Sequence, residues 1–264
     1  MRKHPVMVLL TLIPNLLFSQ NNSCKFISQM EKELSDAHIF SKTKGKSSFS
    51  KIYDLITYRT SNNQSNTISD VDKNLYKTVH IGNQLWMAEN LRVTHYQDGT
   101  EINLIRDNKT WSNLQTGSYC WYNNDSIHKN LYGAIYNFYA VCNSHKLCPM
   151  GWHVPTDIEW TILVDFLGGK NIAGGKLKEV GLSNWKYPNI CANNSTGFTA
   201  LPGGYRIGNS GSFYDFGSVG FWWSSTEYNS EYAYLRYINN NNSSLKKNFY
   251  VKRFGFSVRC IKDN

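Results

Sequence analysis

The residues that could do chemistry in this chain form none of the common catalytic motifs. The sequence has no G-x-S-x-G nucleophile elbow, no H-E-x-x-H helix and no G-x-x-x-x-G-K-[ST] phosphate loop. Its 7 histidines show no paired spacing that suits a metal ion. His153 stands at the start of an expected helix, where a packed, hydrogen-bonded imidazole is the usual role, and helix capping explains Glu159. The sequence therefore predicts a protein that is not an enzyme and that uses neither a metal nor a cofactor.

The cysteines offer either disulfides or thiol chemistry. Six are present: Cys24, Cys120, Cys142, Cys148, Cys191 and Cys260. No two form a C-x-x-C pair, and the interval from Cys142 to Cys148 is too wide for a zinc knuckle. In an oxidising compartment such cysteines form disulfides rather than metal or redox sites.

The best candidate for a binding surface is the run WWSSTEYNSEYAYLRYINNNNSSLKKNFY at residues 222–250. Tyrosine offers rigid contact area with a polar tip, and serine and asparagine offer adaptable hydrogen bonds, a mixture found in antibody loops. In a strand over residues 232–238, alternate side chains separate an aromatic and arginine face from a small, apolar face that suits a core. The predicted ligand-binding residues are Trp222, Trp223, Tyr228, Tyr232, Tyr234 and Arg236. The alternative is an aromatic face that only packs beneath loops.

The charge balance is basic, with 28 Lys+Arg against 19 Asp+Glu and a net charge of +9. Several cations gather near the end of the chain: Lys246, Lys247, Lys252, Arg253 and Lys262. They could favour acidic glycans or could only maintain solubility. Nucleic acid is not an expected partner, because the chain is predicted to be exported.

The first residues have the features of an export signal. Basic residues precede an apolar stretch over residues 6–18, too short to span a bilayer, and Ser19 is a plausible cleavage point. We therefore expect a signal peptide over residues 1–19 and a secreted or cell-surface protein. A lipid anchor at Cys24 is possible but not favoured, because residues 21–23 match a lipoprotein cleavage site poorly. No apolar run elsewhere is long enough for a transmembrane helix in the mature chain.

The remaining chain divides into an accessory segment and a compact domain. Residues 20–66 are expected to form a short amphipathic helix followed by a basic, serine-rich linker. The domain starts near Thr67 with a β-hairpin over residues 76–86. A capping box predicts a helix from Thr156, and a second helix is expected over residues 172–180. A final strand should direct Phe256, Val258 and Cys260 to one face, and Ser257, Arg259 and Ile261 to the other.

Eight ordered segments resemble a known family. They read DVDKNLYKTVHIGNQLWMAENLRVTHYQDG (70–99), SYCWYNND (118–125), YGAIYNFYAV (132–141), KLCPMGWHVPTDIEW (146–160), AGGKLKE (173–179), GFTALPGGYR (197–206), FWWSSTEY (221–228) and GFSVRCIKD (255–263). In this order they resemble the Fibrobacter succinogenes major paralogous domain (FISUMP), over residues 67–264. That family looks related to the C-type-lectin-like fold, which formylglycine-generating enzymes also use. The resemblance implies an α+β domain with two helices, short antiparallel strands, many loops, and terminal strands that lie side by side.

The resemblance also implies disulfides and a limit on chemistry. It pairs Cys148, before the first main helix, with Cys260 on the last strand, and it suggests Cys120 with Cys142. Cys24 and Cys191 are left without an assigned partner. The calcium-site motifs of sugar-binding lectins are missing from the sequence, so calcium-dependent sugar binding is not expected.

Together these patterns predict a non-catalytic binding or adhesion module of the bacterial cell surface. Its ligand, a glycan or a protein, is not identified by the sequence. Two alternatives stay open: an oxidase of the formylglycine-generating kind, which a reactive thiol among Cys148, Cys191 and Cys260 would favour, and a structural envelope component. Domains similar to this one are targets of retroelements that rewrite adenines, so the Tyr, Asn and Ser positions of residues 228–250 could be diversified. Compositional bias explains the same residues.

Overall fold

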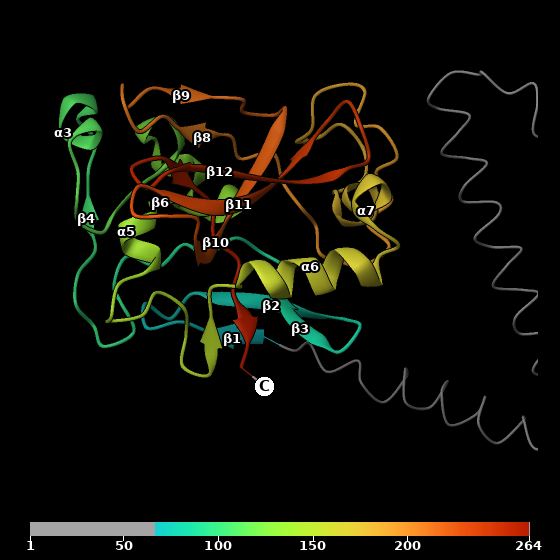
Figure 1. Ribbon diagram of the computed structural model, residues 1–264, viewed down its shortest axis with the longest axis horizontal. Helices are drawn as coiled ribbons and strands as arrows, with labels where there is room; N and C mark the ends of the chain where they lie inside the picture. The colour runs from blue at the N-terminus through green and yellow to red at the C-terminus, as the bar shows by residue number, and fades with distance from the viewer. Residues whose placement is uncertain (1–66, 264) are drawn as a thin grey trace, which may run out of the picture. The chain divides into compact units, whose positions relative to one another are not determined.

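The computed structural model describes residues 67–263, and the predicted signal peptide and the predicted accessory segment over residues 20–66 lie outside them (Figure 1). The described chain is a mixed α+β domain in which many short strands and a few helices alternate with long loops. It contains a five-stranded, a three-stranded and a six-stranded sheet. This agrees with the predicted α+β class.

The five-stranded sheet joins the two ends of the described chain. Its strands, in spatial order, are β1 (Thr67–Ser69), β2 (Leu75–Ile81), β3 (Gln84–Met87), β14 (Ile261–Lys262) and β7 (Trp152–His153). The hairpin of β2 and β3 was predicted and turns at Gly82, whose φ of 61° suits glycine. β14 lies between β3 and β7, so a strand from the end of the described residues joins a sheet that starts with β1.

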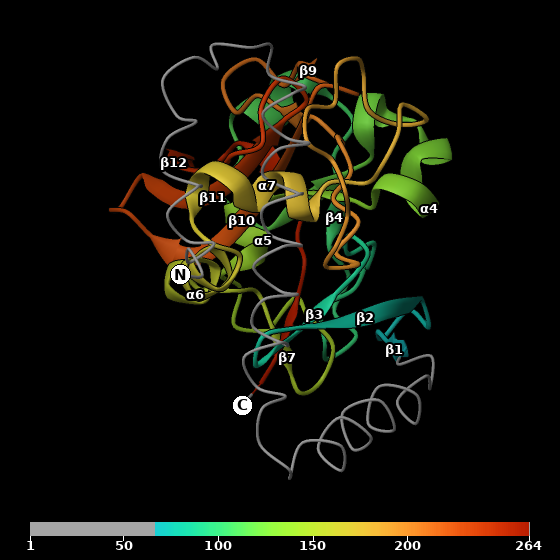
Figure 2. The same ribbon diagram turned by 90° about the vertical axis from the view of Figure 1, so that its right-hand side faces the viewer.

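One of the two main helices lies beside this sheet, and the other lies farther from it (Figure 2). Helix α6 (Asp157–Phe166) starts with the predicted capping box, in which the Thr156 and Glu159 side chains each bond the other residue's backbone amide. Trp160 and Leu163 are fully buried, and the Trp160 ring lies 4.7 Å from that of Trp86 on β3. The second helix, α7 (Lys170–Leu177), begins and ends slightly before its predicted range.

The six-stranded sheet carries most of the loops. Its order is β4 (Asn103–Leu104), β5 (Ser118–Cys120), β6 (Ile135–Asn137), β13 (Gly255–Phe256), β8 (Tyr205–Arg206) and β9 (Phe213–Tyr214). Short helices connect the strands: α3 (Asn108–Ser112), η4 (Tyr122–Asn124), η5 (Ser126–His128), α4 (Lys129–Tyr132) and α5 (Phe138–Val141). Because the strands are so short, side chains from the loops must supply much of the packing.

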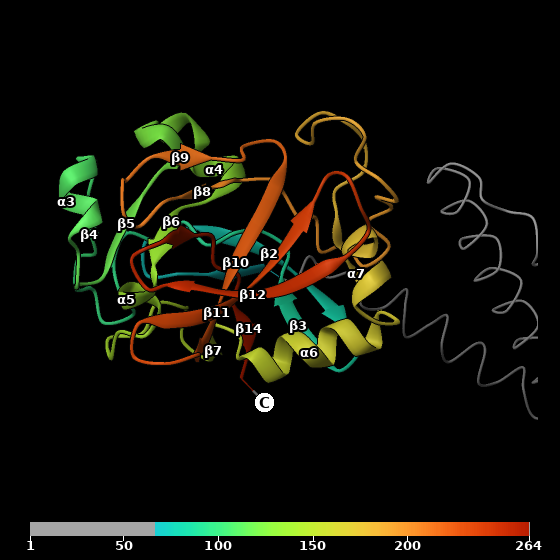
Figure 3. The ribbon, with the colours of Figure 1, turned by 45° about the horizontal axis from the view of Figure 1, so that its top comes forward.

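The three-stranded sheet contains most of the predicted binding run (Figure 3). It consists of β10 (Val219–Glu227), β11 (Tyr232–Asn239) and β12 (Leu245–Val251), all antiparallel. The predicted alternation on β11 is correct over residues 232–235: Ala233 and Leu235 are fully buried, and Tyr232 and Tyr234 are partly exposed. One face of this sheet therefore belongs to the core.

The predicted final strand is divided into two. β13 pairs with β6 and β8, and β14 pairs with β3 and β7, so the chain crosses from one sheet to another over residues 257–260. The predicted alternation persists, but neither side faces water, since Ser257, Arg259 and Ile261 are buried too. Phe256, Val258 and Cys260 belong to the main hydrophobic cluster, whereas Ile261 packs in the cluster beneath α6.

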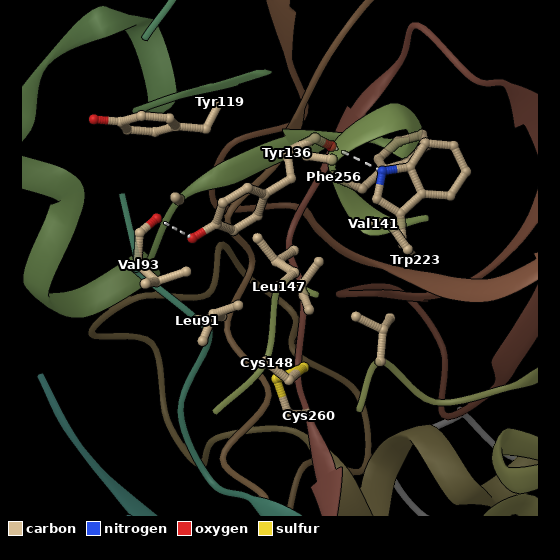
Figure 4. Packing of buried hydrophobic residues seen from close by; sticks show 14 of the residues in the cluster. Leu91, Val93, Tyr119, Tyr136, Val141, Leu147, Cys148, Trp223, Phe256 and Cys260 are labelled. Carbon is tan, nitrogen blue, oxygen red and sulfur yellow. Dashed lines mark hydrogen bonds between the residues drawn. A yellow bond between two sulfur atoms is a disulfide. The ribbon is translucent and has the colours of Figure 1, made fainter. Parts of the chain in front are cut away.

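The predicted link between Cys148 and Cys260 is present in this main cluster (Figure 4). The two cysteines are 112 residues apart in sequence, so the disulfide should stabilise the fold by up to about 4–5 kcal/mol by restricting the unfolded chain. Beside it, the Tyr136 hydroxyl donates to the Val93 carbonyl at 2.7 Å, and the Trp223 indole donates to the Tyr136 carbonyl at 2.8 Å.

The predicted pairing of Cys120 with Cys142 is wrong. Both are free thiols, and Cys120 is buried whereas Cys142 is exposed. Cys120 lies on β5 against the Arg206 side chain, and burial raises its thiol pKa to about 12. Cys142 is the residue directly after α5, and it is exposed. Cys191 is in a disulfide.

Candidate binding site

Four aromatic side chains form an exposed cluster on the outer face of the three-stranded sheet. We call this cluster the aromatic surface; it consists of Tyr228, Tyr232, Tyr234 and Phe249. Tyr234 on β11 lies directly opposite Phe249 on β12, and Tyr228 follows the end of β10. Tyr228 is 48% exposed and Phe249 40% exposed. The pleat of the strands turns these rings outward because the alternate residues fill the core.

The rings support one another rather than enclose a cavity. Tyr228 stacks on Phe249 with centroids 4.1 Å apart and planes only 6° from parallel. Tyr232 and Tyr234 meet Phe249 edge-on, at 5.8 Å and 6.5 Å. Aromatic pairs in these arrangements attract beyond the area that they bury. The surface is thus arranged before any ligand binds, with little side-chain freedom left to lose.

A charged network attaches the aromatic surface to the start of α6. The ammonium group of Lys247 lies 3.9 Å from the centre of the Tyr234 ring and 2.6 Å from Asp157 Oδ2. Asp157 Oδ1 also pairs with Arg236 Nη2 at 2.8 Å. The same Nη2 donates to the Thr161 hydroxyl at 3.0 Å. One carboxylate therefore pairs with two cations, so these three groups keep one positive charge beside the rings and tyrosine hydroxyls that the surface offers a ligand.

Three of the six predicted ligand-binding residues are buried, so the prediction that they lie at a surface is corrected. Trp222 and Trp223 are fully buried, and each indole donates inside the domain, to Asn90 Oδ1 at 2.9 Å and to the Tyr136 carbonyl at 2.8 Å. Arg236 is 3% exposed because α6 lies over it. For Arg236 an exposed face was inferred from strand alternation, without knowledge of the helix that covers one end of the strand. Trp222 and Trp223 were included because they lie in the aromatic run, whose composition does not separate buried rings from exposed ones.

Two residues of the site were missed as ligand contacts. Phe249 lies in the run that was singled out, and Lys247 was noted only as part of a basic cluster. A strand expected over residues 245–251 would have placed both on the side of Tyr234, because residues that pair directly share a face.

Two buried arginines have a different role, which is structural. Arg259 is fully buried; its Nη2 donates to the Thr199 carbonyl at 2.8 Å, its Nη1 to the Phe198 carbonyl, and its Nε to Asn90 Oδ1 at 2.9 Å. Arg206 is equally buried and donates to the carbonyls of Ile105, Arg106 and Gly211. Backbone carbonyls thus replace carboxylates as acceptors, and each guanidinium holds together loops from distant parts of the chain.

Lys178 is a third buried cation. Its ammonium group donates to the carbonyls of Ile190, Asn239 and Asn242 at 2.7, 3.3 and 3.0 Å. Burial lowers the pKa of Lys178 to about 7. It connects the turn between β11 and β12 to the loop that follows α7.

His153 has the structural role predicted for it. Its Nε2 lies 2.9 Å from Glu159 Oε1 and its Nδ1 lies 2.6 Å from Asp263 Oδ1. The hydrogen bond to Glu159, followed by that to Asp263, raises the pKa of His153 to about 9. The protonated imidazole therefore links the cap of α6 to the end of the described chain.

Two features are absent from residues 67–263. No group of three or more His, Cys, Asp or Glu side chains is placed to hold a metal ion in this part of the chain. No helix there is both long and apolar enough to cross a bilayer.

The chain belongs to the Fibrobacter succinogenes major domain family. It matches this family over residues 79–262, which includes both main helices, the three-stranded sheet and the disulfide. The family resemblance that was inferred from eight sequence segments is thereby confirmed. Comparison with curated proteins and with solved structures finds no match.

Proposed function

We propose that this protein is an exported, non-catalytic binding or adhesion module of the bacterial cell surface, and that its ligand contacts the aromatic surface. One observation carries the proposal: Tyr228 and Phe249 remain 48% and 40% exposed although they stack on each other in a fixed arrangement. A preorganised group of rings binds with a small loss of side-chain entropy. The ligand is a glycan or a protein.

The proposal includes a C-type-lectin-like fold. Three features support it: the two ends of the domain meet in one sheet, a capped helix follows β7, and a disulfide joins Cys148 to Cys260, the residue directly before β14. In such an arrangement the exposed face of the three-stranded sheet is free to vary while the ends are held.

The oxidase alternative receives less support than the binding module. Its distinguishing feature was a reactive thiol at Cys148, Cys191 or Cys260, and all three are in disulfides. The free thiol of Cys120 is buried, and its pKa of about 12 keeps it protonated at neutral pH.

The test compares the wild-type chain with the double variant Tyr228→Ala/Phe249→Ala. Fluorescently labelled protein is applied to a glycan array and to intact bacterial cells, before and after surface proteins are removed with protease. The matched control is Tyr214→Ala, which removes a tyrosine that is also 48% exposed but lies on β9.

We expect the double variant to lose at least about tenfold in binding, which corresponds to two ring contacts. The control should bind as the wild type does. Retention on the array identifies a glycan, and protease-sensitive retention on cells identifies a protein. Equal binding by wild type and double variant would contradict the proposal, as would no binding in either arm. Co-fractionation with the envelope in that second case would favour a structural component.

A further inference from the structure

A second open surface lies on the five-stranded sheet. A hollow of about 650 Å³ is formed there by residues of β1, β2, β3, β7 and β14 and by the loop around Met150. This volume falls within the range of small-molecule sites, about 300–1,000 Å³. The hollow is on a different sheet from the aromatic surface and shares no residue with it.

Cross-strand pairing explains the residues on its floor. His80 on β2 is paired with Leu85 on β3, and Lys262 on β14 with Trp152 on β7. The pairing of Ile261 with Trp86 places Lys262 beside Leu85. These four side chains therefore form one row across the sheet, on the same face, and all four line the hollow.

The face of the sheet that carries this row is fully buried only farther along the strands. Tyr76 precedes His80 by four residues, Met87 follows Leu85 by two, and Cys260 precedes Lys262 by two. All three therefore share the face of the row, because alternate residues of a strand point to the same side. They are fully buried in the main hydrophobic cluster, whereas His80 and Lys262 are exposed. The hydrophobic core therefore ends between these three buried residues and the row that lines the hollow.

The lining contains one ammonium group, that of Lys262, and one carboxylate, that of Asp263. The His153 imidazole already pairs with Asp263 at 2.6 Å. Within residues 67–263, Lys262 has no ion-pair partner. Its ammonium group thus stands beside the apolar side chains of Leu85 and Trp152.

We propose that this hollow binds a small amphipathic carboxylate. The carboxylate pairs with the Lys262 ammonium group, and the apolar body of the ligand lies over Leu85 toward His80, roughly two strand spacings or about 10 Å away. Trp152 and the Met150 side chain, which is 82% exposed, flank that body.

The test uses three probes with the same apolar body: 4-phenylbutyrate, 4-phenylbutanol and 4-phenylbutylamine. Each is titrated into the exported chain, and binding is followed by the amide NMR shifts of Gly151 and Lys262. The variant is Lys262→Glu, which reverses an exposed charge without loss of packing. The control is Lys77→Glu, since Lys77 is exposed on the opposite face of the same sheet.

We expect the wild type to prefer the carboxylate over the alcohol by about tenfold, which is the scale of one charge-assisted hydrogen bond. Lys262→Glu should abolish this preference and favour the amine, and Lys77→Glu should retain it. The proposal is overturned if no probe shifts these amides, if carboxylate and alcohol bind equally, or if Lys262→Glu behaves as the wild type.

Discussion

The loops and the aromatic surface each contain a cation placed over an aromatic ring, but the first pair is buried and the second is partly exposed. In the loops, the Arg259 guanidinium lies 4.0 Å from the centre of the Phe198 ring, and both side chains are fully buried. On the aromatic surface, the Lys247 ammonium lies 3.9 Å from the Tyr234 ring, and both side chains are partly exposed. The cation–ring distances are nearly equal, but the acceptors differ: backbone carbonyls for Arg259 and the Asp157 carboxylate for Lys247.

This difference shows which part of the domain can change. A buried cation without its acceptors, or acceptors without their cation, leaves polar groups unsatisfied away from water, which is costly. An exposed cation that loses its ring or its carboxylate is hydrated instead. The loops are therefore held by contacts that tolerate no substitution, and the aromatic surface by contacts that tolerate many.

The largest effect is expected for Arg259→Met. This change leaves the carbonyls of Phe198 and Thr199 without a donor and removes one of the two donors to Asn90 Oδ1, so the free energy of unfolding should fall by about 3–5 kcal/mol. Lys247→Met is the matched control and should cost at most about 1 kcal/mol. Urea unfolding measures both. Equal losses would remove the distinction between the two regions.

Lys178 should make the stability of the loops depend on pH. Its folded pKa of about 7 is lower than the ordinary lysine value, so between pH 7 and 10 the unfolded chain holds a proton that the folded chain lacks. Stability contributed at this site should therefore rise with pH, at up to about 1.4 kcal/mol per pH unit, and should level off below pH 7. The measurement is the unfolding free energy of the wild type minus that of Lys178→Met. A difference independent of pH across this range would show that Lys178 titrates normally.

Neighbouring residues on β11 provide a smaller and local comparison. Tyr234→Ala removes a partly exposed ring and should lower the free energy of unfolding by about 1 kcal/mol. Leu235→Ala, one residue later and fully buried, should lower it by about 2–5 kcal/mol. Thermal unfolding of the two variants measures both losses. If Tyr234→Ala lowers the free energy of unfolding as much as Leu235→Ala does, the Tyr234 ring is part of the core rather than of a surface.

Natural amino-acid substitutions should occur at the exposed residues of this region and not at the buried ones, with almost no effect on stability. If residues 228–250 are diversified, sequencing this region across a bacterial population should find substitutions at Tyr228, Tyr232 and Tyr234. Ala233 and Leu235 should stay constant, because their side chains are buried. An invariant stretch would end the diversification hypothesis, and substitutions spread evenly over both faces would indicate drift.

Patterns of neighbouring residues were enough to predict several local elements. The capping box of α6, the hairpin of β2 and β3 and the alternation on β11 depend on neighbouring residues, so their patterns could be recognised along the chain. The family and the Cys148–Cys260 disulfide followed from the resemblance of several ordered segments.

Which polar and aromatic residues reach water depends on tertiary packing. Arg236 alternates on β11 as a surface residue should, yet α6 covers it. Trp222 lies in the aromatic run, yet it is fully buried and its indole donates to Asn90. Arg259 lies on the predicted outer side of the last strand, but the chain crosses between two sheets there and loops close over it. Burial depends on segments that lie 60 or more residues away, such as Phe198 above Arg259. The period of one strand contains no information about those segments.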